Sequence, residues 1–206
     1  MPIAKLKMGE SVQASVGVPA QDDSRASFGG VFHFTCYDKN GNLKWEEEFP
    51  NLVVNVGLQD LNAKYFKGVS YTAAWYLGLI TGPQSGTTFS ASDTMSSHGA
   101  TGSGGWTEFT NYTGTDRALV SFGTATTANP SVIANTTATG GSVAVYTINS
   151  TGGTIAGAFL TTGQVKSGTS GTLFSAGDFT GSPSTDKIVA SGDTVNVTYT
   201  FSATAT

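Results

Sequence analysis

Apolar and polar residues alternate with a period of two over much of the second half of the chain, most clearly in SVAVYTI and DTVNVTYTF. Successive side chains of a strand point to opposite faces, so this period indicates half-buried strands. Four further segments of strand length lie between turn residues: ALVSFG, SVIANT, TIAGAFLTT and TLFSAGDF. No helical pattern separates these strands. The sequence therefore predicts a mainly β protein, an antiparallel β-sandwich that is jelly-roll-like.

The first half of the chain contains the clearest hairpin, in which KNG joins VFHFTCYD to NLKWEEEF. Its Asn40-Gly41 pair is a strong signal for a tight turn between two strands. Phe32, Phe34 and Cys36 share one face of the first strand because they are two residues apart. Cys36 is therefore expected to be a small core hydrophobe.

One segment has helical rather than strand spacing. Leu58, Leu61 and Tyr65 recur at intervals of three and four residues, and Gly68 is placed to end a helix. The spacing predicts one short helix over Leu58–Phe66. The apolar run YTAAWYLGLITG that follows is of strand length, and its aromatic residues indicate a buried central strand.

The first thirty residues differ from the rest of the chain. They have weak periodicity and end in a Gly-Gly pair, which is typical of an extended segment that is loosely attached to a domain. We therefore expect residues 1–30 to form an extended N-terminal arm and residues 31–206 to form a single β-sandwich domain.

Composition narrows the classes of partner. The chain has 206 residues, a formal net charge of -4 and only 12% charged residues. It therefore lacks the cationic field that holds a nucleic-acid backbone, and we expect no nucleic-acid partner. No stretch approaches the roughly 20 apolar residues of a membrane span, so we expect no membrane partner. One cysteine excludes an intrachain disulfide and a multi-cysteine metal site.

The candidate chemistry is sparse. His98 lies in DTMSSHGATGSGGWTE, between Asp93 and Glu108, and these three residue types can ligate a metal or transfer a proton. Their spacing matches no known catalytic or metal motif. In the alternative interpretation, Asp93 and Thr94 make local hydrogen bonds in a turn, and Trp106 anchors the loop by burial. We expect no enzymatic activity, no cofactor and no metal site.

A longer series of motifs carries a resemblance. The segments are NLVVNVGLQDLNAKYFKG, YTAAWYLGLI, DTMSSH and GGWTEFTNY, followed by Arg117. In this order they resemble a small protein family encoded by many tailed bacteriophages, over a region from about Phe32 to the C-terminus. The chain departs from that pattern at ATGSG, which is inserted between His98 and Gly105.

The resemblance implies a virion protein similar to capsid decoration (cement) proteins, with a jelly-roll-like fold. Such proteins commonly form homotrimers that bind the major capsid protein and bridge its subunits on the outer lattice. The expected location is thus the capsid exterior of the virion, after synthesis in the host cytoplasm. We expect Tyr71 and Trp106 to be exposed interface anchors, and residues 1–30 to reach a capsid subunit or a neighbouring trimer.

Two alternatives use the same fold. A tail or baseplate structural protein needs the same sandwich and the same low charge. A host-glycan-binding β-sandwich would present the aromatic faces of Trp75, Tyr76 or Trp106 to solvent. The first two of these residues lie in an apolar run, which favours a core position.

Overall fold

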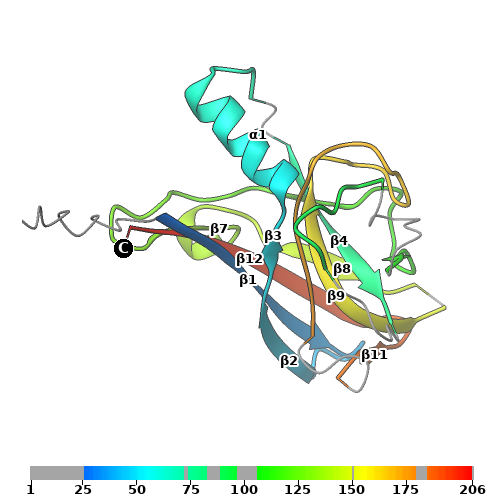
Figure 1. Ribbon diagram of the computed structural model, residues 1–206. Helices are drawn as coiled ribbons and strands as arrows, with labels where there is room; N and C mark the ends of the chain where they lie inside the picture. The colour runs from blue at the N-terminus through cyan, green and yellow to red at the C-terminus, as the bar shows by residue number, and fades with distance from the viewer. Residues whose placement is uncertain are drawn as a thin grey trace, which may run out of the picture.

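The computed structural model describes residues 26–71, 74–82, 89–96, 106–149, 151–179 and 185–205. In this part of the chain the protein is mainly β, with two antiparallel sheets packed as a sandwich, one α-helix and one short 3-10 helix, η1 (Thr137–Thr139) (Figure 1). The predicted fold class is therefore confirmed. The jelly-roll-like connectivity stays a prediction.

The first sheet contains the predicted hairpin and the C-terminal strand. Its strands are β1 (Ala26–Tyr37), β2 (Leu43–Pro50), β7 (Ser131–Ala134), β8 (Ala144–Thr147) and β12 (Thr194–Ala205). The order across the sheet is β2-β1-β12-β7, and β8 also pairs with β12. The hairpin turn places Gly41 at a φ of 85°, a conformation that favours glycine. Cys36 is fully buried, as predicted, and burial raises the pKa of its thiol to about 11.

The second sheet is built mostly from the middle of the chain. Its strands are β3 (Leu52–Val53), β4 (Trp75–Thr81), β5 (Glu108–Phe109), β6 (Ala118–Val120), β9 (Gly153–Thr161), β10 (Leu173–Asp178) and β11 (Lys187–Val189). The order is β3-β10-β9-β4-β5, while β11 also pairs with β9 and β6 with β4. The apolar run before residue 82 thus supplies β4, a buried strand inside the sheet, as predicted.

Two apolar clusters cover the two faces of the second sheet. The main cluster fills the space between the sheets, where Phe34 and Val197 of the first sheet meet Leu77 of the second. The other cluster contains Phe159 and Trp106. Since neighbouring residues of a strand point to opposite faces, the second cluster lies on the far side of this sheet. The second sheet is therefore buried on both faces.

The start of β1 corrects the expected extent of the N-terminal arm. Ala26–Gly30 are not part of an arm, because they pair with the last residues of β12 in an unbroken register. A Cβ atom at Gly30 would lie only 2.5 Å from the Tyr199 hydroxyl, so glycine here allows a close contact. The Gly-Gly pair therefore belongs to a strand. The rest of the predicted arm, residues 1–25, lies outside the described residues.

The helix α1 (Asn55–Phe66) matches the predicted helix and begins three residues earlier. Gly68, at a φ of 64°, follows its last turn, as expected for a terminating glycine. Only Gly57 is buried along the helix, and Figure 1 shows α1 projecting away from the two sheets. A Cβ atom at Gly57 would lie 2.6 Å from the backbone oxygen of Phe174 in β10. The helix is therefore held close to the sandwich at its first turn.

Within the described ranges, no helix has the length and apolar character needed to cross a membrane.

Candidate functional site

Several exposed apolar side chains lie close together in the sequence, at the end of α1 and in the residues that follow it. Tyr65 is 81% exposed, Phe66 78% and Tyr71 60%, and Val69 is also exposed. These four are among ten large exposed hydrophobic residues in the described part of the chain. We call them the α1 aromatic surface. Tyr71, a predicted interface residue, is thus exposed as expected.

A groove with a volume of about 350 Å³ lies beside this surface. Leu61 and Tyr65 of α1 line one side of it, and Ile133 of β7 and Phe201 of β12 line the other. Trp75, at the start of β4, contributes to its lining as well. The groove therefore separates the helix from one end of the first sheet.

The groove exists because the apolar inner face of the first sheet continues beyond its buried part. Along β12, Val197 and Tyr199 are buried, whereas Phe201 on the same face is only half-buried. On β1, Phe28 is 44% exposed although Phe32 on that face is fully buried. Figure 1 shows this end of β1 and β12 extending beneath α1. The sandwich is thus left open at this end.

Aromatic contacts connect the groove from one side to the other. The Trp75 indole donates a 2.9 Å hydrogen bond to the Tyr71 hydroxyl, and its ring packs edge-on against Phe174 at 5.5 Å. Phe174 packs edge-on against Phe201, also at 5.5 Å. Phe201 in turn stacks on Phe28, with ring centroids 6.1 Å apart and planes within 9°. These contacts fix the shape of the lining.

The charged groups at the groove neutralise each other. Lys64 lies 3.1 Å from Asp60 one turn earlier on α1, and its ammonium is 5.3 Å from the centre of the Tyr71 ring. The other lining residues are apolar or tyrosine. An apolar lining with one paired charge suits the binding of an apolar group and offers no arrangement for acid–base chemistry.

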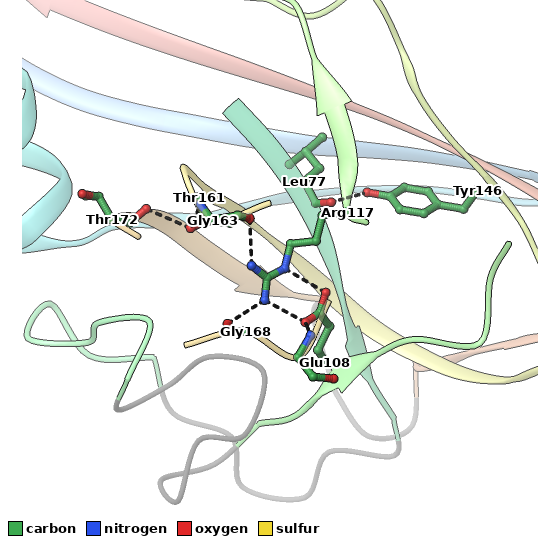
Figure 2. A network of polar contacts seen from close by, with 9 residues as sticks. Leu77, Glu108, Arg117, Tyr146, Thr161, Gly163, Gly168 and Thr172 are labelled. Atoms are coloured by element: carbon green, nitrogen blue, oxygen red, sulfur yellow. Dashed lines mark hydrogen bonds and ion pairs between the residues drawn. The ribbon is translucent and has the colours of Figure 1, made fainter. Parts of the chain in front are cut away.

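A polar network of a different kind lies in the second sheet (Figure 2). Arg117 and Glu108 form two parallel hydrogen bonds, 2.9 Å from Nε to Oε1 and 2.8 Å from Nη2 to Oε2, and both side chains are fully buried. Arg117 also donates to the carbonyl oxygens of Gly163 and Gly168 at 2.8 and 2.9 Å. The backbone amide of Ser167 donates to Glu108 at 2.7 Å. The ion pair thus holds the loop between β9 and β10.

Neighbouring groups are satisfied in the same way. Lys166 donates to the carbonyl oxygens of Tyr112 and Gly114 at 2.8 and 2.7 Å, and burial lowers the pKa of its ammonium. Its Nζ also lies 3.5 Å from the centre of the Tyr112 ring. The Tyr146 hydroxyl donates to the Leu77 carbonyl at 2.7 Å, and burial raises its pKa well above the usual value. These contacts are structural, since each of the charged or hydroxyl groups named is occupied within the protein.

Trp106, the second predicted interface residue, is only 2% exposed, so the expectation of an exposed anchor is wrong. Its ring packs against Phe159 at 5.0 Å in the second apolar cluster. Burial as a loop anchor, the alternative interpretation, fits this position. Trp75 is also buried, and Tyr76 is half-buried. Neither tryptophan therefore offers a ring face to a glycan.

Asp93, His98 and Glu108, the three residues considered as acid–base or metal-binding candidates, are not brought together within the described residues. His98 lies outside them, and Glu108 is paired with Arg117. Asp93 accepts a 2.8 Å hydrogen bond from the Ser90 amide, as predicted for a residue that stabilises a turn. Across the described part of the chain, no three His, Cys, Asp or Glu side chains are arranged to hold a metal ion.

The groove was missed by reasoning from the sequence. Its lining comes from segments as distant as Leu61, Ile133 and Phe201, and no local pattern links them. One signal was present, because Tyr65 and Phe66 are adjacent near the end of the predicted helix. Adjacent residues on a helix point about 100° apart, so two large aromatic residues at such a position indicate an exposed apolar surface.

Comparisons with known proteins give no relative. No family model matches the chain, and no curated protein and no solved structure matches it.

Proposed function

We propose that the protein is a capsid decoration (cement) protein of a tailed bacteriophage, which binds the major capsid protein as a homotrimer and strengthens the head from outside. The α1 aromatic surface is the observation that carries this proposal. Large exposed apolar side chains that lie near one another favour a protein–protein contact, and aromatic anchors that become buried supply much of the binding energy in such contacts. The jelly-roll-like connectivity belongs to the same proposal.

The distribution of charge supports a partner that is protein. Only 12% of residues are charged, and Lys64 near the α1 aromatic surface is already paired with Asp60. Binding through such a surface depends on apolar contact more than on long-range attraction, so it changes little with salt. A lattice contact of this kind holds across the range of ionic strength that a virion meets.

The proposal is tested by sedimentation with undecorated capsids of the encoding phage. The variant Phe66→Ser/Tyr71→Ser removes two aromatic side chains that are mostly exposed. We expect wild-type protein to sediment with capsids and the variant to bind at least about tenfold more weakly, as for loss of interface anchors. The matched control is Val145→Ser, an exposed residue on the outer face of β8, which should bind like wild type.

Failure of wild-type protein to bind capsids would overturn the proposal. Electron microscopy of labelled virions then separates the alternatives, because density confined to the tail or baseplate identifies a tail structural protein.

A further inference from the structure

We propose that the groove between α1 and the open end of the first sheet is the docking site for the N-terminal segment of the same chain, residues 1–25. Docking here requires no virion and no second protein, so it goes beyond the proposed function.

The N-terminal segment is attached close enough to reach the groove. Ala26, the first described residue, lies four residues along β1 from Gly30, which pairs with the groove residue Phe201. At about 3.3 Å per residue, that separation is roughly 13 Å. A flexible chain of 20 residues has an average end-to-end distance of about 25 Å. Residues near position 6 can therefore enter the groove without strain in the connection.

The strand β1 already brings the chain onto the groove lining. Phe28, two residues after the first described one, stacks on Phe201, and Phe201 lines the groove. Phe28 remains 44% exposed, so part of its surface is available for further packing. A segment that continues from Ala26 back over this ring would extend an aromatic surface that is already formed.

The size and charge of the groove favour a peptide segment as its occupant. A volume of about 350 Å³ is within the range of small-ligand pockets, which admits a few side chains and no folded domain. Residues 1–25 contain three basic and three acidic residues, so their formal net charge is zero. The Asp60–Lys64 pair at the groove is also neutral overall, so docking there causes no net electrostatic repulsion. In the run IAKLKM, Ala4, Leu6 and Met8 are two residues apart in the sequence, so an extended conformation would place them on one side. That apolar side matches the apolar lining.

The connection also favours the chain's own segment over a second copy. Attachment through the same chain raises the local concentration of the segment, to about the millimolar range for a short connection. A second copy at micromolar concentration competes poorly with it. Docking within one chain is therefore the arrangement expected for the isolated protein.

Chemical cross-linking tests the proposal on the full chain. The first variant carries Leu6→Cys with Ile133→Cys, which places one thiol on the segment and one in the groove. The matched control carries Leu6→Cys with Val145→Cys, on the outer face of β8. Cys36 stays in place because it is fully buried. With a bis-maleimide reagent, we expect the groove pair to cross-link within one chain at least about tenfold faster than the control pair, at any protein concentration.

Two outcomes would overturn the proposal. Equal rates for the two pairs would show that the segment does not dock in the groove. Cross-links mainly between chains, increasing with protein concentration, would identify a second copy as the occupant.

A second measurement does not depend on introduced thiols. Ile133→Asp places a charge in the groove lining, and we expect trypsin to cleave at Lys5 and Lys7 at least about fivefold faster than in wild type, because apolar docking is lost. Val145→Asp is the control and should leave cleavage unchanged. Unchanged cleavage in both variants would contradict the proposal. Capsids are absent from both experiments, so a negative result leaves the decoration-protein proposal standing.

Discussion

Two regions of the molecule use their side chains in opposite ways. At the Glu108–Arg117 network, charged groups are fully buried and each is bonded to a partner within the protein. At the groove beside α1, the aromatic side chains of Tyr65 and Tyr71 remain exposed and Phe201 is only half-buried. In the Glu108–Arg117 network, folding has paired every charged group. Beside α1, folding leaves apolar surface in contact with solvent.

The difference separates residues that make the fold from residues that can bind a partner. A buried charge is tolerated only when it is paired, so its neighbours are tightly specified. An exposed aromatic residue has no such requirement within its own chain. Glu108, one of the candidate residues from which we expected no activity, belongs to the structural network, whereas the candidate interface is formed by exposed apolar side chains.

The largest loss of stability is expected from breaking the Glu108–Arg117 ion pair. Arg117→Met leaves the Glu108 carboxylate buried without its partner, and we expect a loss of about 3–5 kcal/mol in the free energy of unfolding. Denaturant unfolding followed by tryptophan fluorescence measures it. A loss below about 1 kcal/mol would show that the pair is not essential to the sandwich.

A double variant refines that result. Glu108→Leu/Arg117→Met removes both charges together, so we expect it to lose less stability than the sum of the two single variants. Additive losses would mean that each residue acts mainly through its own backbone partners, such as Gly163 for the arginine.

A smaller loss is expected where α1 joins the sandwich. Gly57→Ala places a Cβ atom 2.6 Å from the Phe174 carbonyl oxygen, and we expect a loss of about 1–3 kcal/mol from this overlap. Alanine favours helices by about 1 kcal/mol over glycine, so a gain in stability would show that the helix can shift away. Asn62→Ala, at an exposed position of the same helix, is the control and should not destabilise the protein.

The smallest change in stability is expected from a substitution on the α1 aromatic surface. Phe66→Ser should alter the free energy of unfolding by no more than about 0.5 kcal/mol, because the ring is 78% exposed. The same denaturant experiment measures it. A loss comparable with that of Gly57→Ala would contradict the comparison, because it would show that the α1 aromatic surface already stabilises the folded chain.

Reasoning from the sequence predicted the strands that bury one face, because their alternation is local. It also predicted Cys36 as a core residue and Gly68 as the end of the helix, and the structure confirms both. It missed the short strands β3, β5 and β11, which contain two or three residues each and are held by pairing with longer strands. A pattern of two residues has no periodicity to detect.

The motif GGWTEFTNY shows that a sequence pattern alone does not distinguish packing residues from interface residues. Trp106, Glu108 and Tyr112 are all buried, and Arg117 after the motif pairs with its glutamate. The motif therefore describes packing in this fold. Trp106 and Tyr71 were both expected to be interface residues, yet only Tyr71 is exposed, since exposure depends on contacts with distant segments such as β9.

The pairing of β1 with β12 has a mechanical consequence. The two strands are antiparallel, and Ala26 at the start of one lies opposite Ala205 near the end of the other. A force that pulls these two ends apart breaks the backbone hydrogen bonds between the strands one after another, starting at Ala26 and Ala205. A force that pulls on Ala26 along the strand, against the body of the sandwich, loads many of them together. An N-terminal segment that carries tension in the second direction would be held far more firmly than one pulled away from the C-terminal strand.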